Sequence, residues 1–265
     1  MNDINPILAA LIGTLIAFSG TVAGAAFVFF TKKELGKKTQ KAFLGFASGV
    51  MIAASVWSLL LPAAEYAVEK GIPEWLPTSV GFLAGAGFLF ALDKLLPHWH
   101  VRAAAPEGLN KNYKKATKLL LAIVLHNVPE GMAVGLAFAL AGGDGSSSVS
   151  LAAAFALAIG IAVQNLPEGA VVSLPFAGEG LPRKKAFAYG ALSGIVEPIA
   201  GVLGALVAVA ATASIPWVLS FAAGAMIYVV VDELVPDAAS EHSDAGTLAA
   251  VVGFALMMVL DTALS

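Results

Sequence analysis

The chain has 265 residues, of which 58% are hydrophobic and only 12% are charged, and its formal net charge is −3. Soluble domains carry about 25% charged residues, so this composition excludes an ordinary soluble domain and is typical of a membrane protein. The absence of cysteine excludes a disulfide framework and a thiolate metal site.

Eight apolar stretches are long enough to cross a membrane, because about 20 helical residues span a hydrocarbon core of about 30 Å. The first stretch lacks the basic start and the cleavage site of a signal peptide, so we expect it to be retained as a span. We therefore predict an all-α, polytopic membrane protein with a single domain over residues 1–265. The predicted spans are 5–30, 42–66, 76–96, 119–141, 149–176, 186–212, 215–236 and 246–263.

The basic residues are concentrated in three predicted loops, at about 31–41, 97–118 and 178–185. With eight spans, all lysines and arginines except Lys70 fall on one face of the membrane. The positive-inside rule makes that face cytoplasmic, so both termini are expected to be extracytoplasmic. Seven or nine spans would instead place basic loops on both faces.

Two similar polar motifs interrupt the spans at 119–141 and 149–176, with the sequences HNVPEG and QNLPEG. His126 and Glu130 are four residues apart, as are Gln164 and Glu168, so each pair shares one face of its helix. The proline in each motif removes a backbone hydrogen bond and kinks the helix, which membranes tolerate where a cavity is lined. The two helices are therefore expected to present imidazole, carboxylate and amide groups to each other.

Three carboxylates, Glu130, Glu168 and Glu197, are expected near the midplane of the membrane, where each charge costs about 2.5 to 3.5 kcal/mol on insertion scales. Counting from the basic loops at 1.5 Å per helical residue places all three about 12 to 18 Å from the cytoplasmic edge. No lysine or arginine of the spans lies among them, so they must be protonated or hold a cation. The neighbouring polar residues at this depth are His126, Asn127, Gln164 and Asn165.

Polar residues and prolines in membrane helices can also serve packing alone, with protonated glutamates hydrogen-bonded to neighbours. The duplicated motif and the third carboxylate favour a metal site over that interpretation. Histidine, carboxylate and amide ligands without sulfur suit Zn²⁺, Fe²⁺, Mn²⁺, Co²⁺ and Cd²⁺ and do not choose among them.

These motifs, together with SGIVEP in the span at 186–212 and eight spans with external termini, resemble the ZIP (Zrt/Irt-like) metal transporters, in particular their prokaryotic GufA-like branch. The resemblance covers almost the whole chain. It implies a two-bundle architecture, import of a divalent metal through a binuclear site, and an elevator-like movement of one bundle past the other.

By position, the resemblance assigns two metal sites. The primary site consists of His126, Glu130, Gln164 and Glu168, and the second consists of Asn127, Asn165 and Glu197 with the bridging Glu130 and Glu168. The chain departs from the family pattern at two positions. Many relatives have histidine where this chain has Gln164, and others have an acid where it has Asn165.

Residues outside the motifs supply further candidates. The resemblance suggests that Met51 caps the primary site, although a methionine of the apolar core is an equal alternative. Glu65 is a candidate for the external entrance. Acids and histidines on the cytoplasmic side are candidates for the exit, with a solvated loop as the alternative: Asp93, His98, His100, Asp232, Glu233, Asp237, Glu241 and His242.

We expect a multi-pass carrier in the inner or plasma membrane that moves zinc, or Cd²⁺, Fe²⁺, Mn²⁺ or Co²⁺, into the cytoplasm. The alternatives are a metal-selective channel and an intramembrane metallohydrolase. Zinc hydrolases usually provide three strong ligands such as histidines, whereas His126 alone lies in the predicted spans, so we expect no enzyme. The expected partners are divalent metal ions, the lipid bilayer and a second copy in a homodimer, with no nucleic acid.

Overall fold

The computed structural model describes residues 5–31, 35–95, 115–141, 149–240 and 244–264. All regular elements in these ranges are helical. Eight helical segments there are long and apolar enough to cross a membrane, which confirms the predicted all-α polytopic class. These segments are Pro6–Phe29, Lys37–Glu69, Trp75–Leu95, Ile123–Ala141, Leu151–Gly178, Arg183–Ala210, Thr212–Ala239 and Asp244–Leu264.

Several spans are built from more than one helical element, because 3-10 and π segments interrupt the α-helices. The elements in chain order are α1 (Pro6–Ala25), η1 (Ala26–Phe29), α2 (Lys37–Ala54), η2 (Ser55–Leu60), α3 (Leu61–Glu69), α4 (Trp75–Leu95), α5 (Lys115–Ala141), α6 (Leu151–Gly178), α7 (Arg183–Ser193), α8 (Val196–Ala210), η3 (Thr212–Ser214), α9 (Ile215–Val229), η4 (Val230–Leu234), α10 (Val235–Ala239) and α11 (Asp244–Leu264).

The basic loops are shorter than predicted. Helix α2 already begins at Lys37, α5 at Lys115 and α7 at Arg183. The apolar pattern marks only the part of a helix inside the hydrocarbon, whereas charged residues at a helix end can reach the aqueous boundary. Lys41, placed at the end of a loop by the sequence, is a buried residue of α2 whose Nζ donates to the Ser240 carbonyl at 2.6 Å.

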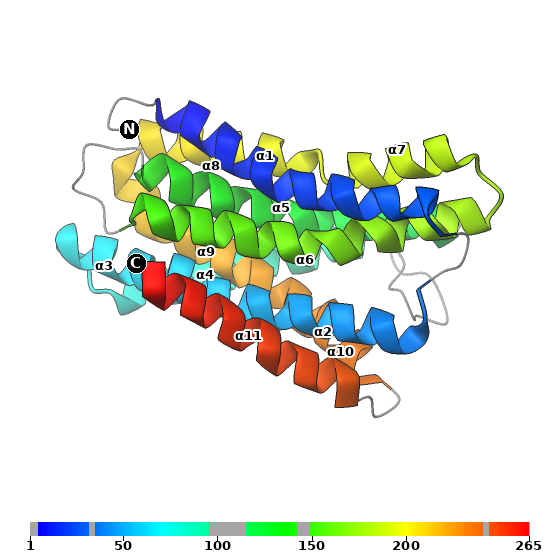
Figure 1. Cartoon of the computed structure of the whole chain (residues 1–265). Helices are drawn as coiled ribbons and strands as arrows, with labels where there is room; N and C mark the ends of the chain where they lie inside the picture. The colour runs from blue at the N-terminus through cyan, green and yellow to red at the C-terminus, as the bar shows by residue number, and fades with distance from the viewer. Residues whose placement is uncertain (1–4, 32–34, 96–114, 142–148, 241–243, 265) are drawn as a thin grey trace.

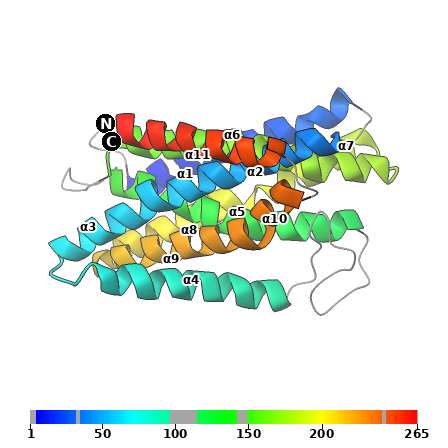
Figure 2. The same ribbon diagram turned by 90° about the horizontal axis from the view of Figure 1, so that it is seen from below.

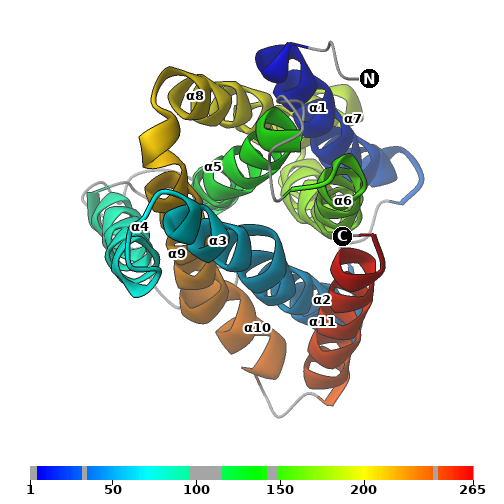
Figure 3. The ribbon, with the colours of Figure 1, turned by 90° about the vertical axis from the view of Figure 1, so that its left-hand side faces the viewer.

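The helices form two bundles, as the family resemblance implies (Figure 3). In the first bundle α1 packs on α5, α6, α7 and α8, and α5 packs on α8. In the second, α2 packs on α11 and α10, while α9 packs on α4, α3 and η2. Helices α4 and α11 lie at opposite edges of the second bundle (Figure 2). The bundles meet mainly where α2 and α11 contact α6 and where α9 contacts α5.

Glycines allow the backbones within each bundle to touch. A Cβ atom on Gly20 or Gly24 of α1 would collide with carbonyl groups of α6, and one on Gly131 of α5 would collide with the backbone of Glu197. In the second bundle, Gly49 makes the same kind of approach to α11. Such contacts allow the helices of one bundle to pack more closely than larger residues would permit.

Prolines and π segments set the helix geometry near the bundle boundary. Pro129 and Pro167 lie inside continuous helices, α5 and α6. The π segments η2 and η4 are both in the second bundle, and each is followed by a proline at the start of the next helix, Pro62 or Pro236. The span at Arg183–Ala210 breaks between α7 and α8, just before the Glu197-Pro198 pair, so that Glu197 lies in the first turn of α8.

The first helix begins and the last helix ends at the same end of the molecule (Figure 1). This arrangement agrees with an even number of spans. The described basic residues at the starts of α2 and α7 lie at the opposite end, as the sequence predicted.

Candidate metal centre

The two PEG motifs, HNVPEG in α5 and QNLPEG in α6, are joined by a side-chain hydrogen bond. The Gln164 amide Nε2 donates to Glu130 Oε1 at 2.5 Å and to the Asn165 Oδ1 at 2.7 Å. All three side chains are fully buried. The structure therefore brings the two motifs into contact, although Glu130 and Glu168 are 38 residues apart in the sequence.

Glu197 of α8 extends this polar layer. It accepts a hydrogen bond from Thr21 Oγ1 of α1 at 3.0 Å. Its own helix approaches α5 through Gly131. The three carboxylates predicted to share one layer of the membrane thus come from α5, α6 and α8, and all three are buried.

The two asparagines of the motifs donate to backbone carbonyls. Asn127 Nδ2 donates to the Ser193 carbonyl at 3.0 Å, where α7 ends, and Asn165 Nδ2 donates to the Ala17 carbonyl at 3.4 Å. These bonds fix the amide nitrogens against the first bundle. Because the nitrogen of Asn127 faces the backbone, its oxygen is turned the other way.

Five buried side-chain oxygens in this region accept no hydrogen bond. They are Asn127 Oδ1, Glu130 Oε2, Gln164 Oε1, Glu168 Oε2 and Glu197 Oε2. An unsatisfied buried acceptor costs about 1 to 3 kcal/mol, and more if it is charged. A divalent cation bound by several such oxygens removes that cost, and carboxylate and amide oxygens are ligands that such ions accept. The region is therefore a candidate metal centre.

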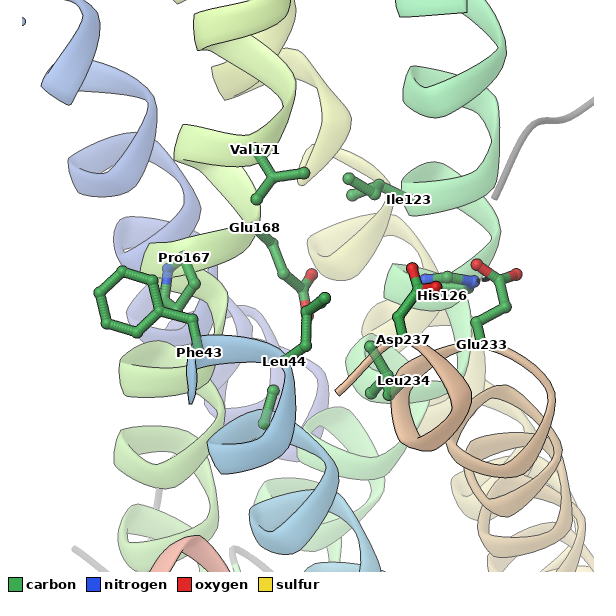
Figure 4. A pocket seen from close by; sticks show the side chains of 11 residues that line it. Phe43, Leu44, Ile123, His126, Pro167, Glu168, Val171, Glu233, Leu234 and Asp237 are labelled. Atoms are coloured by element: carbon green, nitrogen blue, oxygen red, sulfur yellow. Dashed lines mark hydrogen bonds and ion pairs between the residues drawn. The ribbon is translucent and has the colours of Figure 1, made fainter. Parts of the chain in front are cut away.

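His126 also makes a contact with the second bundle. Its Nε2 lies 2.6 Å from Glu233 Oε1, which belongs to η4 of the second bundle. Figure 4 shows His126 directed toward Glu233, while Glu168 points into the same pocket from α6. The other residues that line this pocket are mostly apolar: Phe43, Leu44, Ala47, Ile123, Pro167, Val171, Leu234 and Asp237.

The predicted exit acids are brought together beside His126. One oxygen each from Asp93 of α4 and from Asp232 and Glu233 of η4 lie within 4.8 Å of one another. Asp93 is buried, Asp232 is exposed, and Glu233 is partly buried. Through Glu233, this acidic cluster is in direct contact with a predicted metal ligand.

The remaining candidates lie apart from the centre or outside the described residues. Met51 is fully buried in the main apolar core, and a cap on the primary site remains a prediction. Glu65 is exposed on α3, at the end of the molecule where the chain's first helix begins. The predictions for His98, His100, Glu241 and His242 concern residues outside the described ranges.

Two polar residues that the sequence analysis did not single out form hydrogen bonds between helices. Asp261 is 2% exposed in α11 and accepts a hydrogen bond from Ser58 Oγ at 2.6 Å. The criterion that identified Glu197, a carboxylate within an apolar span, applies equally to Asp261. Thr21 carried a weaker signal, because a threonine hydroxyl in a helix commonly bonds its own backbone.

Comparison with known proteins identifies the family. A family model described as "ZIP Zinc transporter" matches residues 113–261. The chain is 34% identical to "Zinc transporter ZIP11" of Bos taurus, with 98% of each chain covered. It is 36% identical to "Zinc transporter ZIPB" of Bordetella bronchiseptica, over 96% of this chain and 81% of that protein. It is 34% identical to "Zinc transporter GufA" of Myxococcus xanthus, over 97% of this chain and 99% of that protein.

The matched region contains both PEG motifs, Glu197 and the acids of η4, so the comparisons cover most of the candidate centre. They confirm the resemblance that the sequence motifs indicated. The chain therefore belongs to the ZIP family of zinc transporters.

Proposed function

We propose that this protein is a carrier that moves divalent metal ions, zinc foremost, across the cell membrane into the cytoplasm. The observation that carries the proposal is the set of five buried oxygen acceptors without hydrogen-bond partners on α5, α6 and α8. The relatives named as zinc transporters support this cargo and favour a transporter over an enzyme. The end with the basic residues is assigned to the cytoplasm by the positive-inside rule.

Two adjacent sites would share Glu130 and Glu168. The primary site takes His126 and Gln164 in addition, with Met51 as its cap, and the second takes Asn127, Asn165 and Glu197. Glu65 would attract ions at the external entrance, and Asp93, Asp232 and Glu233 would receive them at the exit.

The transport test is zinc uptake by proteoliposomes that contain the purified full chain. Saturable uptake without ohmic current supports a carrier, whereas ohmic zinc current would indicate a channel.

The elevator-like movement is supported by the difference between contacts within and between bundles. Within bundles, many glycines place backbone against backbone, as at Gly24 and Gly49, while others such as Gly13 meet a side chain. At the boundary, Gly160 of α6 instead meets the side chains of Met257 and Val50 from the second bundle. Flexible side chains can change rotamer as one bundle slides, whereas interlocked backbones cannot.

Cross-linking across the boundary tests this movement. Because the sequence contains no cysteine, a thiol reagent reacts only with the introduced cysteines. We expect a bifunctional thiol reagent to cross-link Gly160→Cys with Met257→Cys and to stop zinc uptake, with recovery after cleavage of the linker. The control pair, Ala10→Cys with Ala205→Cys, joins two buried residues within the first bundle. Cross-linking of that pair should leave uptake intact. Equal loss of uptake in both pairs would contradict the movement.

The asparagine at position 165 is expected to limit metal binding at the second site, because an amide oxygen is a weaker ligand than a carboxylate. Asn165→Asp should therefore allow an additional zinc ion to bind per chain, measured by elemental analysis of the purified protein. Asn165→Ala is the matched control and should not raise zinc content. An unchanged zinc content in Asn165→Asp would remove Asn165 from the proposed second site.

A further inference from the structure

Thr21 of α1 donates its hydroxyl to a side chain of another helix. Its Oγ1 lies 3.0 Å from Glu197 Oε1 of α8, and both residues are fully buried. A threonine in a helix commonly returns its hydroxyl to its own backbone. Thr14, two turns earlier in α1, does so, because its Oγ1 donates to the Ala10 carbonyl at 2.8 Å. Thr21 instead joins α1 to a proposed ligand of the second metal site.

The break between α7 and α8 leaves room for this contact at Gly194. A Cβ atom on Gly194 would lie 2.8 Å from Glu197 Oε1 and 2.9 Å from the Cβ atom of Thr21. The Gly194 carbonyl accepts from the backbone N–H of Glu197 at 3.0 Å, which fixes the start of α8. The preceding residue, Ser193, accepts from Asn127 of the same proposed site. The hydroxyl and the carboxylate thus meet where the chain carries no side chain between them.

The backbone of Glu197 is also closely packed. A Cβ atom on Gly131, the residue after Glu130 in the PEG motif of α5, would collide with the backbone of Glu197. With its backbone packed in this way, the carboxylate changes position mainly through its side-chain torsions. Thr21 binds one carboxylate oxygen and so restricts those torsions, while the other, Oε2, is buried and accepts no hydrogen bond.

The same face of α1 contacts a second residue of the proposed site. Asn165 Nδ2 donates to the carbonyl of Ala17 at 3.4 Å, and Ala17 lies one turn before Thr21. Gly20 brings the backbones of α1 and α6 together at Ala162, where a Cβ atom would collide with the carbonyl. Helix α1, which supplies none of the predicted metal ligands, therefore contacts two of the side chains that do.

We propose that Thr21 is a positioning residue, which binds Glu197 Oε1 and so keeps Oε2 oriented for a metal ion at the second site. The inference rests on the proposed transport function, because the ion is the cargo. Hydrogen bonds to metal ligands commonly orient them in this way. Without the Thr21 hydroxyl the carboxylate rotates more freely, and an ion has to order it on binding, so affinity falls.

Replacement of the hydroxyl by a methyl group tests this role. Zinc binding to the purified full chain is measured by titration calorimetry, and Glu197→Ala identifies the binding event to which Glu197 contributes. Thr21→Val should weaken that event about tenfold, the lower end of the range for residues that hydrogen-bond to metal ligands. Thr21→Ser keeps the hydroxyl and should bind zinc nearly as the wild type does. An unchanged affinity in Thr21→Val, or in Glu197→Ala, overturns the inference.

A double-mutant cycle shows whether Thr21 acts through the carboxylate. In the Glu197→Ala background, Thr21→Val should cause no further loss of affinity. A loss of the same size with and without Glu197 would overturn the inference.

Thr14→Val is the matched control, because it makes the same exchange at a fully buried threonine of α1 that bonds its own backbone. Its zinc affinity should equal that of the wild type. An equal loss in Thr14→Val and Thr21→Val would indicate a general effect on packing and would overturn the positioning role. Failure of the proposed function is separate, because it would appear as an absence of zinc uptake by the wild-type protein, whereas calorimetry does not depend on transport.

Discussion

Glu130→Ala is expected to reduce zinc uptake by proteoliposomes by at least about 100-fold, since even residues that only support metal ligands commonly contribute 10- to 100-fold. Glu130 is fully buried, is bound by Gln164 through one oxygen, and keeps its second oxygen without a partner. Its removal would take away the carboxylate shared by both proposed sites. Glu168→Ala should have a comparable effect, because Glu168 is the other shared carboxylate.

The control for these variants is Glu179→Ala, which removes an exposed carboxylate just beyond the end of α6. Its uptake should remain close to that of the wild type. Size-exclusion profiles of all three variants establish that they are folded. Uptake near the wild-type rate in both Glu130→Ala and Glu168→Ala would show that the centre is not on the transport route.

Gly24→Ala is expected to destabilise the first bundle substantially. A Cβ atom at Gly24 would collide with the backbone carbonyl of Leu166, two residues before Glu168, so α1 and α6 must separate. Overpacking costs about 1 to 3 kcal/mol even where side chains can adjust. For a chain of this size we expect the melting temperature in detergent to fall by about 5 °C or more.

Gly87→Ala is the matched control for that substitution, because no atom lies within 4 Å of a Cβ at this position of α4. Alanine favours the helix over glycine by about 0.5 to 1 kcal/mol, so its melting temperature should be unchanged or slightly higher. Equal melting temperatures for the two variants would contradict the close contact of α1 with α6. A fall in uptake for Gly24→Ala alone would link that contact to the geometry of the centre.

Much of the centre could be predicted from spacing and depth. Glu130, Glu168 and Glu197 were expected in one layer because helical rise converts residue counts into depth, and the structure buries all three on helices of the first bundle. The contact of Gln164 with Glu130 agrees with two facing motifs. Depth, however, does not specify which way a side chain points. His126 shares the depth of Glu130 but bonds Glu233 of the other bundle.

The sequence by itself determined the eight spans, the placement of the basic loops on one face of the membrane, and the motifs that identify the family. Those features are local: each depends on the composition of about 20 consecutive residues or on the spacing within one helix. Loop boundaries were less accurate, because helices continue past the hydrocarbon into charged residues such as Lys37 and Arg183.

Only the tertiary structure decided which helices are neighbours. All spans are similarly apolar, and lipid offers them no hydrophobic reason to choose one partner over another, so packing and interhelical hydrogen bonds make the choice. The contacts that follow join distant residues: Thr21 to Glu197, Ser58 to Asp261, and His126 to Glu233. The last of these joins the two bundles, and its geometry exists only once both bundles are assembled.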